Sequence, residues 1–430
     1  MRKPLFVLMA TIAATLQAQT TPAGPLTLAH AEAIALRNHP QVAVAMNEAA
    51  AAGQRVREAR SAYYPTVNGE ITGSQALDQS RLGAGFLTTS SVFNRFGTGL
   101  EVDQLVTDLG RTKNLVADSR LQAQAADQST QATRFDVALG VTRAYFGVLE
   151  AQALVKVAED TIRARQTLDD QVTALAKAQL KSQVDVSFAD VNVSQARLML
   201  IRARNGVHEA YADLTRALGA DTPTNYQLSE DDLPPNPPPD AEALIAEAIQ
   251  NRPELRELRL RLEAAHRFEA AERDLSRPNV NLLGVGGVLP YLDQSPRTAP
   301  DEYEAVAVNV DIPIFNGHLF AARRQAAHDE MLAANQRVRA LQQSVERDVR
   351  AAWAGATNAW ERIPVTEEMV KQSQLALNLA HGRYELGLAS IVEVTEAQLN
   401  LTQAQIENVT ARYDYHSAFA ELQYTKGALR

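Results

Sequence analysis

The sequence has 430 residues, of which 46% are hydrophobic, 6% aromatic and 22% charged, and it contains no cysteine. Its 42 Lys and Arg against 51 Asp and Glu give a formal net charge of −9, without a basic patch typical of nucleic-acid binding. The lack of cysteine excludes a disulfide scaffold, a thiolate zinc site, a cysteine nucleophile and a lipid anchor on an N-terminal cysteine. An apolar fraction made mostly of Ala, Leu and Val favours long, closely packed helices.

Residues 1–18 have the pattern of an export signal. Arg2 and Lys3 precede an apolar stretch from Leu5 to Ala14, and a small-residue cleavage site ends at Ala18. The alternative is a membrane anchor, but this stretch is too short to span hydrocarbon. We therefore expect a cleaved signal peptide and an exported mature chain that is not lipidated.

The chain contains two copies of one pattern. Pro40 and Pro65 recur 213 residues later as Pro253 and Pro278, and Leu180 recurs as Leu388 within a longer run at an offset of 208. This repetition predicts a first repeat over 19–222 and a second over 241–430. Between them, residues 223–240 form a Pro-rich linker, which favours an extended connector.

Each copy predicts the same elements, namely a short helix, a β-hairpin and a long helical pair. The helical pairs cover about 108–219 and 317–427, and the apolar residues of the first pair recur every seven positions, as in coiled coils. At 1.5 Å per residue, the first helix of that pair would be roughly 100 Å long. The heptad residues of the first pair are Leu154, Thr161, Leu168 and Leu175, then Val186, Val193, Leu200, Val207 and Leu214.

The expected hairpins cover about 65–106 and 279–313. In their strands, apolar residues occupy every second position over about ten residues, as in the stretch from Val306 to Ile312. This length and period match strands tilted across an outer membrane. Five aromatic residues near the hairpin ends are expected in interfacial belts. They are Phe86, Phe93, Phe96, Tyr291 and Tyr303. The strand patterns alone would slightly favour a soluble two-hairpin sheet, but the export signal and the duplication shift the balance to the membrane.

Four strands cannot close a barrel, and lipid does not tolerate an open sheet edge. Several chains must therefore share one barrel if the hairpins enter a membrane. Three chains would supply about twelve strands, which is within the known range. The pattern requires an oligomer but leaves the number of chains open.

The residues provide no case for catalysis, a cofactor or a metal. The eight His residues lack ligand spacing, and we expect His39, His381 and His416 to be surface or helix-packing residues. The stretch from Gly284 to Gly287 lacks the Lys-Ser/Thr of a phosphate loop, so we interpret it as a Gly-rich strand.

Residues 383–398, RYELGLASIVEVTEAQ, together with residues 28–40 and 64–67, resemble the TolC-like outer-membrane efflux factor family. The resemblance covers nearly the whole mature chain. It implies an α+β membrane protein in which a trimeric, 12-stranded transmembrane β-barrel with four strands per chain continues into a long α-helical barrel. It also implies a homotrimer that docks to a periplasmic adaptor, and through it to an inner-membrane pump or secretion ATPase.

The helical tips carry the candidate site residues. Ser182 with Asp185, and Ser390 with Glu393, have the spacing of a capping box, which is one explanation of these acids. The resemblance instead places Glu393 and Glu396 in an acidic ring at the periplasmic entrance, which would favour and be blocked by cations. It also assigns a gate hydrogen bond to Asp185 and Tyr384. It assigns adaptor docking to the tip residues Leu180, Ser182, Gly387, Leu388 and Ser390.

Two positions depart from the family pattern. Gln179 stands where the 208-residue offset would place a counterpart of Gly387, so the first turn is expected to differ from the second. Ala389 stands where some members carry a basic residue in the entrance network, which weakens the case for a gate closed by a cation.

Together these features predict a passive exit duct in the outer membrane, which is part of a tripartite efflux or type I secretion system. The alternative is an exported periplasmic coiled-coil scaffold or stalk without a membrane barrel. Both explain the heptads, but only the duct explains the duplicated hairpins. The residues do not identify the cargo, the adaptor or the pump.

Overall fold

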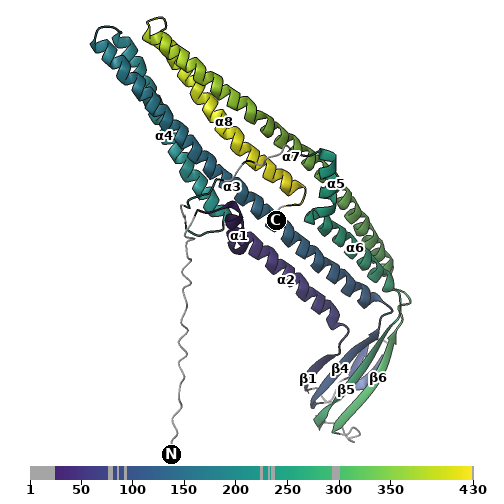
Figure 1. Ribbon diagram of the computed structural model, residues 1–430. Helices are drawn as coiled ribbons and strands as arrows, with labels where there is room; N and C mark the ends of the chain where they lie inside the picture. The colour runs from purple at the N-terminus through teal and green to yellow at the C-terminus, as the bar shows by residue number, and fades with distance from the viewer. Residues whose placement is uncertain are drawn as a thin grey trace, which may run out of the picture.

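The computed structural model describes residues 25–75, 81–84, 87–91, 94–222, 226–230, 233, 238–292 and 301–428. The expected export signal, Phe86, Phe93 and much of the Pro-rich linker lie outside these residues. The molecule is elongated, with a β-sheet at one end and the turns of two long helical hairpins at the other (Figure 1).

The two copies contain helices of identical length. In each copy the four helices have 11, 22, 67 and 35 residues, in that order. The helices of the first copy are α1 (Leu28–Asn38), α2 (Pro40–Ser61), α3 (Arg111–Lys177) and α4 (Gln183–Ala217). Those of the second are α5 (Ala241–Asn251), α6 (Pro253–Asp274), α7 (Leu319–Glu385) and α8 (Ile391–Thr425). The duplication therefore extends to whole elements.

Two helices, rather than the single short helix expected, precede each sheet segment. The chain bends at His39 in the first copy and at Arg252 in the second, and both residues are extended. Each precedes a proline, which disfavours helical backbone in the residue before it but suits the first position of the next helix. The break is therefore a local effect of Pro40 and Pro253.

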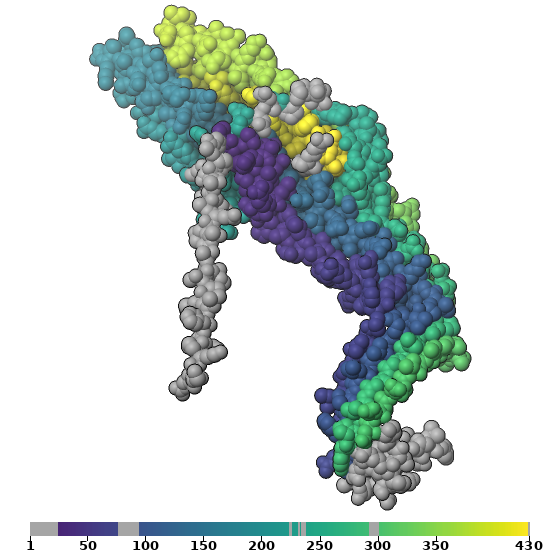
Figure 2. Space-filling view, turned by 60° about the horizontal axis from the view of Figure 1, so that its bottom comes forward, coloured from purple at the N-terminus to yellow at the C-terminus, as the bar shows by residue number. Residues whose placement is uncertain are grey.

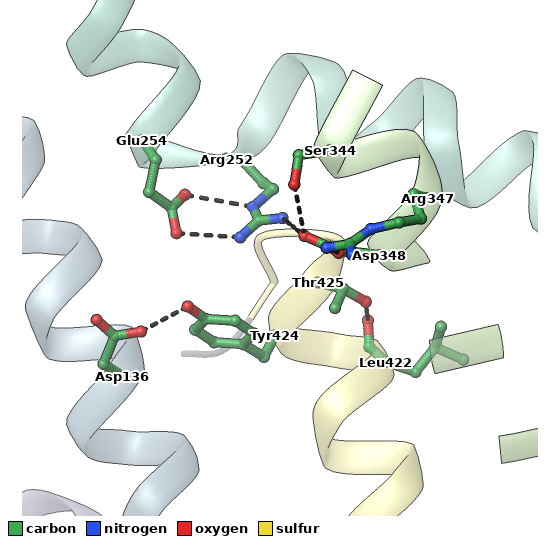
Figure 3. A network of polar contacts seen from close by, with 9 residues as sticks. All are labelled: Asp136, Arg252, Glu254, Ser344, Arg347, Asp348, Leu422, Tyr424 and Thr425. Carbon is green, nitrogen blue, oxygen red and sulfur yellow. Dashed lines mark hydrogen bonds and ion pairs between the residues drawn. The ribbon is translucent and has the colours of Figure 1, made fainter. Parts of the chain in front are cut away.

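The bend in the second copy is held by a polar network (Figure 3). The Arg252 guanidinium donates to both carboxylate oxygens of Glu254, at 3.2 and 3.3 Å, and lies 3.9 Å from Asp348 of α7. Tyr424 of α8 donates to Asp136 of α3, and burial together with that carboxylate raises the pKa of the Tyr424 phenol. The network connects α3, α6, α7 and α8 midway along the molecule.

The long helices pack as two antiparallel hairpins, α3/α4 and α7/α8, whose turns lie at the same end of the molecule (Figures 1 and 2). Helix α3 contacts α8 between the hairpins, so α4 and α7 form the outer sides. The heptad residues Leu168, Val186, Val193 and Leu214 are buried in these contacts. This confirms the coiled-coil-like packing predicted for the first pair.

The main sheet is antiparallel with the order β1-β4-β5-β6. Its strands are β1 (Thr66–Ser74), β4 (Arg95–Thr107), β5 (Asn279–Leu292) and β6 (Glu302–Asp311). A small separate sheet pairs β2 (Arg81–Ala84) with β3 (Leu87–Ser91). Gly284 to Gly287 lie within β5, which confirms the interpretation of this stretch as a strand.

The strand register gives the main sheet a mainly apolar face, on which Gln104 and Glu304 also lie, and a face richer in polar residues, called the polar face below. Opposed residues share a face, so Val102, Gly284 and Val306 lie in one row and Val308 pairs with Leu282 in the next. The other face carries acidic and amide side chains. They include Glu70, Glu101, Asp103, Asn281, Asn309 and Asp311.

The aromatic residues divide between the two faces. Phe96 pairs with Gly73 and Tyr291 on the apolar side, as a membrane belt requires. Tyr303 pairs with Gly287 on the polar side, so its assignment to that belt is wrong. The cause is a one-residue difference in strand phase, which moves a side chain to the opposite face.

None of the helices, as far as the structure describes them, combines the length and the apolar character required to cross a membrane.

Candidate functional site at the helical tips

The two helical tips have the same turn. At the first, the amides of Gln179 and Leu180 donate to the carbonyls of Ala176 and Leu175, both at 2.9 Å. At the second, the amides of Gly387 and Leu388 donate to the carbonyls of Tyr384 and Arg383, at 3.1 and 2.8 Å. This pair of bonds is the Schellman motif, which closes a helix with one left-handed residue.

Gln179 adopts the left-handed backbone that its counterpart Gly387 adopts, with φ of 61° against 72°. The expectation that the first turn differs from the second is therefore wrong. A non-glycine residue in this region costs about 1–2 kcal/mol. The hydrogen bonds of the turn hold Gln179 there despite that cost.

The capping explanation holds at one tip and fails at the other. The Ser182 hydroxyl accepts from the Val184 amide at 3.0 Å, and Asp185 accepts from the Ser182 amide at 3.2 Å, which completes a capping box. At the other tip, the Ser390 hydroxyl accepts from the Glu393 amide at 3.4 Å. The Glu393 carboxylate, however, pairs with Arg383 at 3.3 Å and does not return to Ser390.

Tyr384 is buried between the two hairpins. Its side chain is 2% exposed and packs among apolar residues of both hairpins, with the Lys181 ammonium 4.0 Å from its ring centroid. Burial, together with the negative charge of Asp185, raises the pKa of the Tyr384 phenol. The Asp185 charge therefore acts on the Tyr384 phenol across the interface of the two hairpins.

The predicted hydrogen bond between Asp185 and Tyr384 is not formed in the single chain. The Tyr384 hydroxyl has no hydrogen-bond partner among the described residues. The Asp185 carboxylate is instead directed to the Ser182 amide, because capping the first turn of α4 satisfies an otherwise unpaired donor.

The remaining predicted tip residues lie on the surface. Leu180 and Leu388 are 69% and 68% exposed, and Ser182, Gly387 and Ser390 are also exposed. Glu393 and Glu396 are exposed on α8, one turn apart. Ala389, in contrast, packs against the apolar cluster that contains Tyr384.

Sequence reasoning missed two exposed apolar stripes on the outer sides of the hairpins. The stripe on α4 and the turn before it consists of Leu180, Val184, Phe188, Val191, Leu198 and Ile201. The stripe on α7 and the turn after it consists of Val365, Met369, Leu375, Leu379 and Leu386. Apart from the step of six between Met369 and Leu375, these residues are three, four or seven positions apart, which was a detectable signal of an apolar helix face. It was overlooked because the heptads of the inner seam already explained the long helices.

The histidines take structural positions. His416 is buried and stacks on Phe146 with 4.3 Å between ring centroids, and His39 accepts from the Gln41 amide at the start of α2. His381 is partly exposed and lies 3.8 Å from Glu385 on the same helix. In the described part of the chain, no cluster of His, Asp and Glu is arranged to hold a metal ion.

Comparison with known proteins identifies the architecture. The family model described as "Outer membrane efflux protein" matches residues 33–220 and again 244–428, once for each copy. The chain is 22% identical to the outer membrane protein TolC of Salmonella enteritidis over 91% of this chain and 80% of that protein. It is 25% identical to the cation efflux system protein CusC of Escherichia coli O157:H7, over 81% and 75%.

A crystal structure of CusC superimposes with a TM-score of 0.79 at 20% identity, over 93% of this chain and 92% of that one. The fold is thus that of the TolC-like channels, with four barrel strands and two long helical hairpins per chain. The chain belongs to the outer membrane efflux protein family and is an outer-membrane efflux channel.

Proposed function

We propose that three copies of this chain form the exit duct of a tripartite efflux or type I secretion system. The duct passively receives substrate from a periplasmic adaptor and an inner-membrane pump or secretion ATPase. The mature chain would begin at Gln19 after removal of the signal, without a lipid anchor. Residues 19–222 and 241–430 would be the two repeats, joined by the linker 223–240.

The sheet edges support a ring of chains. Strands β1 and β6 are the two edges of the main sheet, and within the described chain neither pairs on its outer side. Because an unpaired edge is not tolerated in lipid, β6 of one chain would pair with β1 of the next. This contact is head-to-tail, so it closes only as a ring.

The apolar stripes on α4 and α7 support the same ring and carry the proposal. Helix α4 begins just after the first tip, and α7 ends just before the second tip. A residue of α4 and a residue of α7 that are equally far from their tips therefore lie at the same height along the molecule. Phe188 is then level with Leu379, Val191 with Leu375, and Ile201 with Val365. Two stripes that match along their length would form a continuous seam between neighbouring chains.

Disulfide trapping tests this seam. Phe188→Cys combined with Leu379→Cys should give covalent trimers on mild oxidation, and the cysteine-free chain supplies no competing thiol. The control pairs Phe188→Cys with Val365→Cys, about 21 Å away along α7 and beyond disulfide reach. Non-reducing electrophoresis of membranes provides the measurement. Equal cross-linking of both pairs, or of neither, would contradict the seam.

The acidic ring at the entrance remains a proposal. Three copies of Glu393 and Glu396 would converge on the aperture, with Arg383 partly neutralising Glu393. Glu396→Ala should weaken the cation preference and the block by multivalent cations in planar bilayers, because this carboxylate has no capping role. The matched control is Glu368→Ala, which removes a carboxylate of α7 that lies several helical turns away from the tip. Unchanged cation block in Glu396→Ala would exclude this carboxylate from the aperture.

The gate pair remains a proposal too. Among the described residues the buried Tyr384 hydroxyl has no hydrogen-bond partner, and the Asp185 charge acts on it. A charge-assisted hydrogen bond between the two would require Asp185 to leave the Ser182 amide. If this bond holds the assembled entrance closed, Tyr384→Phe should raise the resting conductance while the ring stays packed. Resting conductance equal to that of the wild type would remove Tyr384 from the gate.

A further inference from the structure

Two glycines, Gly99 of β4 and Gly287 of β5, lie opposite each other in the sheet. Efflux does not by itself explain why both positions lack a side chain. In the register, Glu70 of β1 lies opposite Gly99 of β4, Gly99 opposite Gly287 of β5, and Gly287 opposite Tyr303 of β6. Two neighbouring strands thus lack a side chain beside a tyrosine. Glycine within a strand weakens pairing and often marks a place where another group approaches closely.

That group is the phenol ring of Tyr303. A methyl group on Gly99 would overlap the Tyr303 hydroxyl oxygen, and would lie 3.2 Å from its Cζ and 3.1 Å from the Gly286 carbonyl oxygen. A methyl group on Gly287 would overlap the Thr98 carbonyl oxygen, and would lie 2.6 Å from the Tyr303 hydroxyl oxygen and 2.7 Å from the Cα of Gly99. Side chains in strands normally stand roughly perpendicular to the sheet. Tyr303 instead leans across β5 to β4 and fills the space that the two glycines leave.

The ring lies on the polar face of the sheet, near the end farthest from the helices. It shares this face with Glu70 and with Glu101 of the adjoining row, while Val306 and Val308 occupy the opposite face. Tyr303 is the second residue of β6, and the chain returns to the helices only after Asp311. In the trimeric barrel proposed above, the polar face lines the lumen, so Tyr303 lies at the exit.

We propose that Gly99 and Gly287 form a slot that holds Tyr303 flat against the lumen wall, and that this slot keeps the exit of the duct wide. The inference rests on the proposed barrel. In the single chain, Tyr303 is 40% exposed while it occupies this slot. Three rings displaced from their slots would project toward the axis and narrow the bore at one level.

The test is the single-channel conductance of purified protein in planar bilayers. Every protein carries Tyr384→Phe to open the proposed entrance gate, and wild type below means the protein with that change alone. Gly99→Ala should lower the conductance beyond the spread of wild-type channels, because its methyl group displaces the movable end of Tyr303. Adding Tyr303→Ala to Gly99→Ala should restore the conductance to the wild-type level or above. Gly284→Ala is the matched control, since its methyl group faces the other side with Val102 Cβ at 3.9 Å.

The possible outcomes distinguish a failure of the proposed slot from a failure of the proposed duct. Failure of the wild type to conduct would overturn the proposed duct. Wild-type conductance in Gly99→Ala, or a loss that Tyr303→Ala does not restore, would overturn the slot. If Gly99→Ala fails to assemble, Tyr303→Trp replaces it, because the larger ring exceeds the slot and should also lower the conductance. Wild-type conductance in Tyr303→Trp would then overturn the slot.

Discussion

Replacing Val308 with Arg should sharply reduce the yield of trimer in the outer membrane. Val308 is 67% exposed in the single chain and lies on the apolar face beside Val306 and Val310, opposite Leu282. An arginine on the lipid face near the middle of the bilayer costs about 2–4 kcal/mol in each chain. Heat-modifiable trimer in outer-membrane fractions is the quantity to measure.

The neighbouring residue supplies the control. Asn309 pairs with Asn281 on the polar face, where an arginine side chain would meet water in the lumen. Asn309→Arg should therefore assemble far better than Val308→Arg. Similar yields of the two variants would show that the assignment of the faces is wrong.

Replacing Gly387 with Val should abolish efflux while leaving the barrel inserted. The φ of 72° at Gly387 is a conformation that a β-branched residue strongly disfavours, although no atom lies within 4 Å of an added Cβ. The cost exceeds the about 1–2 kcal/mol of an unbranched residue, because the branched Cβ of Val is excluded from this region. It falls on the turn that presents Leu388 and Ser390 to the proposed adaptor. Drug or dye export from intact cells, together with trimer yield, measures both effects.

The first copy of the chain shows which residue Gly387 can tolerate. Gln179 occupies the equivalent turn with nearly the same backbone, so Gly387→Gln should keep most of the activity. Full export by Gly387→Val, or equal loss in both variants, would contradict the role assigned to this turn.

Local patterns were sufficient to predict much of the fold. The heptads located the first long hairpin because coiled-coil packing depends on residues three and four apart, and period-two alternation located β1, β4 and β6. The internal repeat placed the second hairpin and β5. The break before Pro40 was missed, although the effect of a proline on the preceding residue is also local. Assigning one helix there overlooked a signal that the sequence contains.

The candidate site was less predictable, because the residues that interact there are brought together only by the folded chain. Glu393 has correct capping spacing, but Arg383 approaches it across the turn and takes its carboxylate. The position of Tyr303 depends on the register between β4 and β5, strands nearly two hundred residues apart in the chain. The apolar seam of α4 and α7 is incomplete in one chain, so its meaning depends on a second copy.

The most direct test of the account is the location and the native mass of the full-length protein expressed with its own signal. Native mass spectrometry of detergent extracts from separated inner and outer membranes would measure both. A trimeric exit duct would be found as a complex of three chains in the outer membrane, each beginning at Gln19. A soluble periplasmic protein, or a membrane complex of any other number of chains, would contradict it.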